Sequence, residues 1–127
     1  MIRHTFKKEE RLTNKKTFDL LFNTGTSFAA APFRFVWLTT TSTAALPVQL
    51  GISVPKRSFA KAVDRNTIKR RIREAYRKNK HELYEILTKK NLHIAVMVIY
   101  TAKEELPYTE IEKKMLVSLQ KLIGQQQ

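Results

Sequence analysis

The positive charge of this chain is concentrated in one segment, and that segment must also contribute to the core. Residues 55–80 carry eleven Lys or Arg and two Asp or Glu, a net charge of +9 out of +13 for all 127 residues. The segment spaces Ile68, Ile72, Ala75 and Tyr76 three or four residues apart, which predicts a helix with one apolar stripe. Such a helix must lie on the surface of the fold, with its stripe packed against the remainder.

Basic side chains cover the arc next to that stripe. Cations four residues apart repel one another and destabilise an isolated helix. Phosphate groups would neutralise this repulsion, and the planar guanidinium of arginine suits bidentate phosphate contacts. The arc therefore favours nucleic acid as a partner over an anionic membrane surface, and a purely solvated face is the alternative. Its residues are Arg65, Asn66, Lys69, Arg70, Arg73, Arg77 and Lys80.

The other hydrophobic patterns predict an α+β domain. Thr13 or Asn14 can cap a first helix that ends at Gly25. Strands are expected near 26–29, over 33–38 and 48–54 with a hairpin loop between these two, and at 94–100, whose continuous apolar run indicates a central strand. The resulting order is α-β-β-β-α-β-α, a two-layer sandwich with a central mixed sheet. We expect a single domain over 1–127, with flexible ends at 1–8 and 124–127.

The ends of the later helices follow from capping residues. Asp64 is a good N-cap for the basic helix, and the pattern leaves open whether this helix continues to Lys90 or breaks near Asn79. A capping box at 109–112 begins the last helix, and Gly124 is expected to end it.

A second group of candidate residues combines aromatic rings with two cations. Rings beside basic residues can stack on unpaired bases, as single-stranded RNA requires, although core packing is the alternative for each ring. Lys56 and Arg57 directly follow a predicted strand, where a loop can aim them at the same ligand. The rings are Phe18, Phe22, Phe33, Phe35 and Trp37.

The residues that most enzymes need are scarce. The chain has no cysteine, which excludes disulfides and thiolate metal sites, and only three glycines, too few for a phosphate-cradling loop. Its two aspartates, Asp19 and Asp64, are far apart in the sequence, and no histidine has an acidic or serine partner at a catalytic spacing. We expect no catalytic residue and no metal site in this chain. The apolar runs are too short to span a bilayer, so we expect a cytoplasmic protein.

The motifs of the chain resemble those of the bacterial ribonuclease P protein subunit. Residues 62–77, AVDRNTIKRRIREAYR, resemble the signature helix of that family, which carries an Arg-Asn-Arg motif. Arg11-Leu12 with the first helix, and residues 51–57, GISVPKR, match further motifs in the same order. Thr67 departs from the pattern, because the third position of the motif is usually Arg. On a helical wheel Thr67 lies outside the main basic face, and Arg70 or Arg71 could substitute for the missing cation.

The resemblance implies a function that composition does not. Members of the family bind a large catalytic RNA, and the ribonucleoprotein removes the 5′ leader of precursor tRNA by metal-assisted hydrolysis, with Mg²⁺ bound through the RNA. A monomer in a one-to-one complex and a left-handed βαβ crossover are implied as well. The catalytic RNA would contact Arg65, Asn66, Lys69, Arg70, Arg73 and Arg77, and the leader would lie in a cleft lined by Phe18, Phe22, Phe35, Lys56 and Arg57.

Two other functions fit part of the pattern. A ribosomal or other structural RNA-binding protein would share the basic helix and the α+β order. A DNA-binding protein could use residues 65–80 as a recognition helix, but such a helix normally sits in a helix-turn-helix pair, and the strand-rich first half argues against it.

Overall fold

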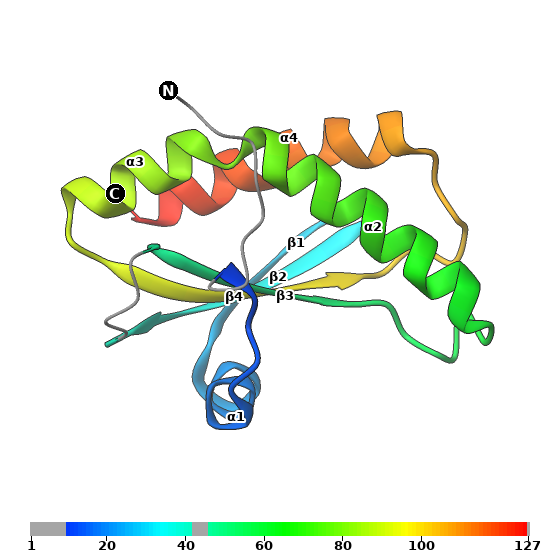
Figure 1. Ribbon diagram of the computed structural model, residues 1–127, viewed down its shortest axis with the longest axis horizontal. Coiled ribbons are helices and arrows are strands. Elements are labelled where there is room, and N and C mark those ends of the chain that lie inside the picture. The colour runs from blue at the N-terminus through cyan, green and yellow to red at the C-terminus, as the bar shows by residue number, and fades with distance from the viewer. Residues whose placement is uncertain (1–9, 42–45, 127) are drawn as a thin grey trace.

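Four helices and four strands make up the fold of the computed structural model, which describes residues 10–41 and 46–126 (Figure 1). Their order confirms the predicted α-β-β-β-α-β-α pattern, with the basic helical region divided in two. The elements are α1 (Lys15–Thr24), β1 (Thr26–Ala30), β2 (Phe33–Thr40), β3 (Val48–Ser53), α2 (Ala62–Asn79), α3 (His81–Lys89), β4 (His93–Tyr100) and α4 (Tyr108–Gln126).

The strands form one mixed sheet in the order β1-β2-β4-β3. β2 is antiparallel to both β1 and β4, whereas β3 and β4 are parallel. The predicted hairpin between β2 and β3 is therefore wrong, because β4 lies between them; residues 42–45 of the expected hairpin loop fall outside the described residues. β4 has a neighbour on each side, which confirms the central strand expected from its continuous apolar run.

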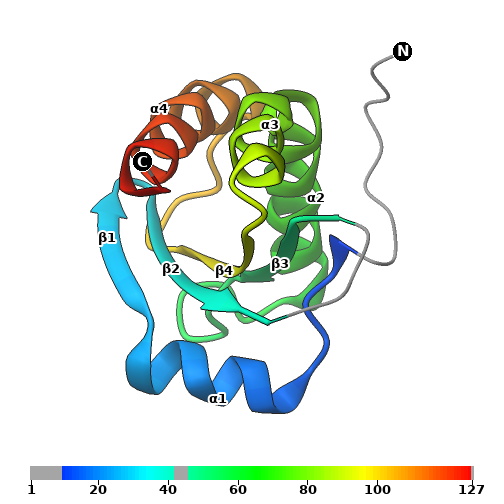
Figure 2. The ribbon, with the colours of Figure 1, turned by 90° about the vertical axis from the view of Figure 1, so that its left-hand side faces the viewer.

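Helices α2, α3 and α4 cover one face of the sheet, and α1 lies alone on the other (Figure 2). The connection from β3 through α2 and α3 to β4 returns over the sheet with a left-handed turn, as the two ribbon views show together. This is the crossover that the family resemblance implied, against the strong right-handed preference of parallel βαβ units.

The pleat of the strands divides their side chains between two apolar clusters. Phe33 and Phe35 point toward α2–α4 and join the larger cluster, where the apolar stripe of α2 is fully buried. Val36 and Met97 point the other way and pack with Leu21 of α1. Successive residues of a strand face opposite sides of the sheet, so the two clusters follow directly from the alternation in sequence.

The ends of α1 match the prediction. Asn14 caps the helix by accepting a hydrogen bond from the Lys16 N–H (2.9 Å), and the Gly25 N–H donates to the Leu21 carbonyl. A Cβ on Gly25 would lie 2.5 Å from the Leu21 carbonyl oxygen and 2.7 Å from Val36 Cγ1. The close approach of α1 to β2 therefore requires glycine at this position.

Three predicted helix ends are wrong. α2 begins at Ala62 with Lys61 at its N-cap, so Asp64 lies inside the first turn, where a carboxylate favours the helix dipole. α4 begins at Tyr108, one residue before the expected capping box, and the Glu112 carboxylate accepts from Tyr108 Oη (3.0 Å). α4 also continues past Gly124 through Gln126, over most of the end that was expected to be flexible; residues 1–8 and 127 lie outside the described residues.

The break between α2 and α3 resolves the question that the sequence left open. Lys80, at the junction, is 4% exposed, and its ammonium pairs with the equally buried carboxylate of Glu10. Tyr84 Oη donates to the same carboxylate, and the hydroxyls of Tyr84 and Tyr76 share a hydrogen bond of 2.9 Å. This buried network fastens the segment before α1 to the helical layer.

Candidate RNA-binding surfaces

Four of the predicted basic-arc residues gather on the exposed side of α2. Asn66, Lys69, Arg70 and Arg73, spaced by three and four residues, line a shallow depression of about 390 Å³ together with Val63 and Thr67. We call Asn66, Lys69, Arg70 and Arg73 the helix basic face. Three cations and an amide on one stripe of a helix can contact successive phosphates of an RNA strand.

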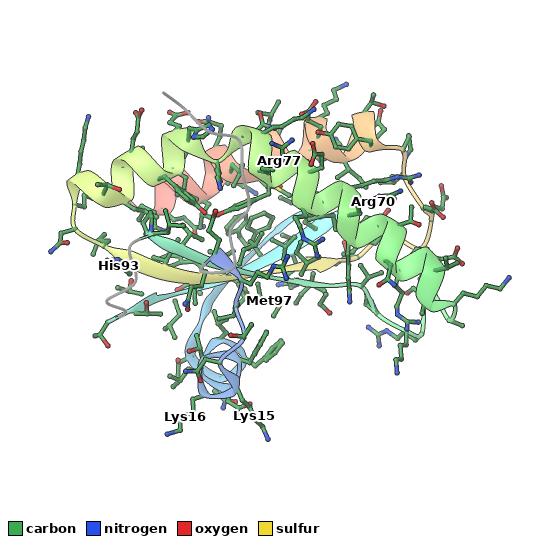
Figure 3. The ribbon with its side chains drawn as sticks, in the orientation of Figure 1. Lys15, Lys16, Arg70, Arg77, His93 and Met97 are labelled. Carbon is green, nitrogen blue, oxygen red and sulfur yellow. The ribbon has the colours of Figure 1, made fainter. Side chains whose placement is uncertain are left out.

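The two ends of the predicted arc serve the protein itself. Arg65 Nη1 donates to the carbonyls of Phe59 (2.8 Å) and Ala60 (2.9 Å), which holds the loop before α2. Arg77 forms an ion pair with Glu74, and the hydrogen bond from Arg77 lowers the pKa of the Glu74 carboxyl. Lys80 is turned into the fold, as described above. The charge available to a ligand is therefore smaller than the sequence suggests, and on α2 it comes from the helix basic face, which includes Arg70 (Figure 3).

The structure bears on both expectations about Thr67, which stands where the family motif usually has Arg. Thr67 lines the same depression as the helix basic face, although its hydroxyl donates to the Val63 carbonyl (2.9 Å). Arg71 is less suited than Arg70 to replace the missing cation, because Arg71 Nη1 donates to the Leu106 carbonyl (2.8 Å) and pairs with Glu105 (3.2 Å). Arg70 is exposed and remains available.

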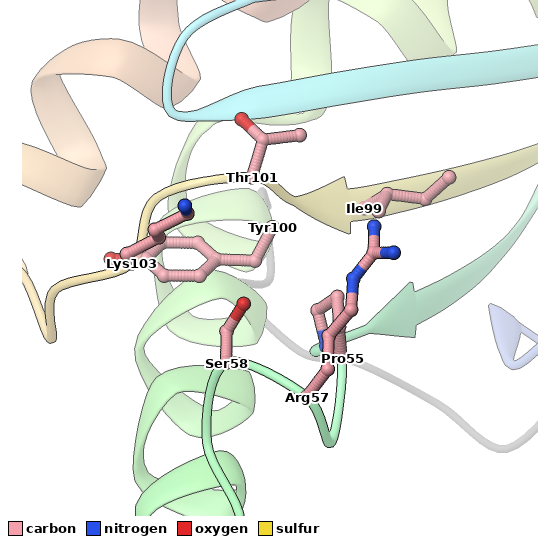
Figure 4. A pocket seen from close by; sticks show the side chains of 7 residues that line it. All are labelled: Pro55, Arg57, Ser58, Ile99, Tyr100, Thr101 and Lys103. Atoms are coloured by element: carbon pink, nitrogen blue, oxygen red, sulfur yellow. The ribbon is translucent and has the colours of Figure 1, made fainter.

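A second basic surface lies where β3 and β4 end. Parallel neighbours end at the same edge of a sheet, so the loops after β3 and β4 meet and enclose a pocket of about 600 Å³ (Figure 4). In this view Arg57 lies beside Ile99, and Lys103 lies beside the ring of Tyr100. We call this the strand-end pocket; its lining residues are Pro55, Arg57, Ser58, Ile99, Tyr100, Thr101 and Lys103.

The strand-end pocket has one lining residue that faces the α1 side of the sheet. Ile99 lines the pocket and also packs against the smaller apolar cluster, where Phe18 is half-buried. One turn further along α1, Phe22 is 63% exposed. Lys56 and Arg57 are exposed after the end of β3. The structure thus places Phe18 and Phe22 on α1, and Arg57 in a pocket that adjoins the α1-side cluster through Ile99.

Phe35 does not belong to that surface. Its side chain is completely buried on the opposite face of the sheet, where it stacks on Phe28 with ring centroids 5.3 Å apart. The prediction that Phe35 lines a cleft with Phe18 and Phe22 is wrong, because the pleat directs Phe35 toward α2–α4 and its neighbours Arg34 and Val36 toward α1.

Sequence reasoning missed Lys103, Ser58 and Thr101. Lys103 follows β4 as Lys56 and Arg57 follow β3, and this parallel placement is a signal in the sequence. The placement of Lys103 predicts a shared site only when β3 and β4 are known to be parallel neighbours. The predicted hairpin paired β3 with β2 instead, so this site was not predicted.

The described part of the chain has neither a metal-binding cluster nor a membrane-spanning helix. In residues 10–41 and 46–126, no three His, Cys, Asp or Glu side chains come close enough to hold a metal ion. Over the same residues, no helix is both long and apolar enough to cross a membrane.

Comparison with known proteins agrees with this geometry. A family model described as Ribonuclease P matches residues 6–123. The ribonuclease P protein component of Porphyromonas gingivalis is 36% identical over 120 residues, which cover 92% of this chain and 85% of that protein. That of Streptococcus pneumoniae is 34% identical over 110 residues, covering 87% and 81%.

A solved structure extends the likeness to the fold. The ribonuclease P protein from Thermotoga maritima superposes with a TM-score of 0.68 at 26% identity, covering 88% of this chain and 96% of that one. A ribosomal or other structural RNA-binding protein is therefore not favoured. The chain belongs to the ribonuclease P protein family, the protein components of the ribonucleoprotein that processes the 5′ ends of tRNA.

Proposed function

We propose that the chain uses two separate surfaces in tRNA processing. The helix basic face binds the RNA subunit of ribonuclease P, and the α1 side of the sheet with the strand-end pocket binds the single-stranded 5′ leader of precursor tRNA. The observation that carries this proposal is the separation itself. The helix basic face lies on α2, whereas Phe22 belongs to α1 on the other side of the sheet, and the strand-end pocket lies at the sheet edge where β3 and β4 end.

The helix basic face suits a structured RNA. Its side chains belong to one rigid helix, whose apolar stripe is fully buried, so their spacing is fixed before binding. Cations at fixed spacing contact phosphates without reading bases, which is the usual way of holding an RNA by its shape. Arg65 and Arg77, from the predicted contact set, border this face while bonded to the protein.

The α1 side suits an unpaired strand. Phe22 offers an exposed ring on which a base can stack, and Arg57 and Lys103 offer cations for the phosphates that follow. Phe18 supports this surface from its half-buried position, and Lys56 lies at its margin. A strand that stacks on Phe22 and passes Ile99 reaches the strand-end pocket.

We further propose that catalysis belongs to the RNA subunit, with Mg²⁺ ions bound through RNA phosphates, since Mg²⁺ prefers phosphate oxygens and water to side-chain cages. One helix basic face and one strand-end pocket per chain fit a one-to-one complex with that RNA. A cytoplasmic location fits the precursor tRNA substrate.

Reconstitution with a bacterial ribonuclease P RNA tests the proposal. We expect the protein to stimulate cleavage of precursor tRNA at low Mg²⁺. Lys69→Ala with Arg70→Ala should weaken binding of the RNA subunit, and the slope of log K against log[salt] should fall by about 0.7–0.9 for each phosphate contact removed. Arg57→Ala should instead weaken binding of precursor tRNA and leave that of mature tRNA, which lacks a leader, unchanged. Absence of stimulation would contradict the proposal.

A further inference from the structure

The loop between β4 and α4 is held in place by the hydroxyl group of one buried tyrosine. Tyr100 is 1% exposed, and its Oη donates to the Glu104 carbonyl (2.6 Å) while accepting from the Leu106 N–H (3.2 Å). Both bonds are to loop backbone on the far side of Lys103. The hydroxyl therefore fixes the path of the chain immediately after that lysine.

Arg71 of α2 holds the same loop from the other side. Its Nη1 donates to the Leu106 carbonyl (2.8 Å) and lies 3.2 Å from the Glu105 carboxylate. Leu106 is thus bonded through its N–H to Tyr100 and through its carbonyl to Arg71. An arginine of the helix that carries the helix basic face is directly bonded to the loop that lines the strand-end pocket.

This loop carries two residues of the strand-end pocket, Thr101 and Lys103. Lys103 is exposed, and a long side chain on an unrestrained loop would lose much conformational freedom on binding a phosphate. The hydrogen bonds and the ion pair at Glu104, Glu105 and Leu106 restrict the backbone of the loop that carries Lys103. Lys103 is therefore presented beside the Tyr100 ring, across the pocket from Arg57 (Figure 4).

We propose that Arg71 and Tyr100 are positioning residues for leader binding, which act through Lys103 and connect the helix basic face to the strand-end pocket. Arg71 contributes no phosphate contact of its own, because its guanidinium is bonded to the loop. The inference rests on the proposed function of the strand-end pocket. It adds that one cation of α2, Arg71, serves the leader rather than the RNA subunit.

The measured quantity is the leader-dependent gain, the ratio of the Kd of the reconstituted holoenzyme for mature tRNA to its Kd for precursor tRNA. Lys103→Ala should lower this gain about two- to tenfold, the range for one hydrogen-bonded contact. Arg71→Ala and Tyr100→Phe should each lower it by a similar or smaller factor, while the affinity for the RNA subunit stays within about twofold. The matched control Arg70→Ala, one residue away on α2, should weaken binding of the RNA subunit and leave the gain unchanged.

Double variants separate positioning from direct contact. In a Lys103→Ala background, Arg71→Ala and Tyr100→Phe should have no further effect on the gain, because the side chain that they position is gone. Multiplicative losses for Arg71→Ala and Lys103→Ala would mean that Arg71 touches RNA itself, which overturns the inference. Tyr100→Phe removes one oxygen and keeps the ring, so it provides the test even where Arg71→Ala impairs folding.

The outcomes also distinguish this inference from the proposal beneath it. An unchanged gain in both Lys103→Ala and Arg57→Ala would show that the pocket does not bind the leader, and both the inference and the proposal would be wrong. An unchanged gain in Lys103→Ala alone would refute the inference, because the side chain that is positioned would not contact the leader. If Lys103→Ala lowers the gain but Arg71→Ala and Tyr100→Phe keep the wild-type gain, the positioning role of Arg71 and Tyr100 is refuted. The proposal that the pocket binds the leader would still be supported.

Discussion

The helix basic face and the strand-end pocket are both basic, but they are built in opposite ways. All four residues of the helix basic face come from one helix, and each lies three or four positions from two of the others in the sequence. The pocket takes its cations from two loops, and Arg57 and Lys103 are 46 positions apart. A face made by one element can be predicted from periodicity, whereas a site made by two requires the strand pairing.

The comparison also shows how the charge of the basic segment is divided. Arg65, Arg71, Arg77 and Lys80 are all bonded within the protein, to loop carbonyls or to carboxylates. Lys69 and Arg70 face the depression on α2. Part of the charge that indicates an RNA partner therefore holds the loops and segments around α2 in place, and only the remainder is available to RNA.

The largest expected contrast is between two phenylalanines that the sequence places in one group. Phe35→Ala should lower the free energy of unfolding by about 3–5 kcal/mol, because it removes a completely buried ring. Phe22→Ala should change stability little, since this ring is 63% exposed, and should weaken leader binding by about 1–3 kcal/mol through the loss of base stacking. Urea denaturation and binding of precursor tRNA measure the two effects. Global unfolding of the Phe22 variant would place that ring in the core instead.

The second contrast separates buried from exposed lysines at the end of α2. Lys80→Ala should lower the free energy of unfolding by about 3–5 kcal/mol, because it leaves the Glu10 carboxylate buried without its ammonium partner. Lys78→Ala is the control, since Lys78 is exposed and its ion pair with Glu74 is 4.0 Å long; it should cost no more than about 1 kcal/mol. Equal losses in urea denaturation would mean that the Glu10 network does not fasten the chain.

Alkaline pH tests the same network through its tyrosines. Burial raises the pKa of both Tyr76 and Tyr84 above the ordinary value of 10.0. Above about pH 10 the unfolded chain releases these protons while the folded chain keeps them, so stability is complete below that pH and falls as the pH rises. Each tyrosine contributes a loss of about 1.4 kcal/mol per pH unit. Tyr84→Phe should reduce the slope of unfolding free energy against pH, and an unchanged slope would contradict the assignment.

Local patterns predicted most of the elements, because helices and strands are set by nearby residues. The stripe Ile68, Ile72, Ala75 and Tyr76 is buried as expected, and the cap at Asn14 is present. The pairing of β2 with β4 instead of β3 was not predictable from alternation, which is the same for any antiparallel partner. The wrong placement of Phe35 beside α1 had a different cause. Alternation predicts that Phe35 and Val36 lie on opposite faces of the sheet, but it does not predict which of the two faces α1 covers.

The smallest expected effect concerns Thr67, where the family pattern has arginine. Thr67 lines the depression beside the helix basic face, and its hydroxyl bond to the Val63 carbonyl stays within its own helix, so Thr67→Arg disturbs no other element. Arginine is also the better helix former. If Lys69 and Arg70 contact the RNA subunit as proposed, the added cation lies within reach of the same RNA, so the variant should bind the RNA subunit more tightly. The slope of log K against log[salt] should become steeper by about 0.7–0.9, the change for one new phosphate contact.

Thr67→Gln, long and uncharged, is the matched control and should leave the slope unchanged. If Thr67→Arg binds with the wild-type slope, the RNA does not reach this end of the depression, and the helix basic face is confined to Lys69, Arg70 and Arg73.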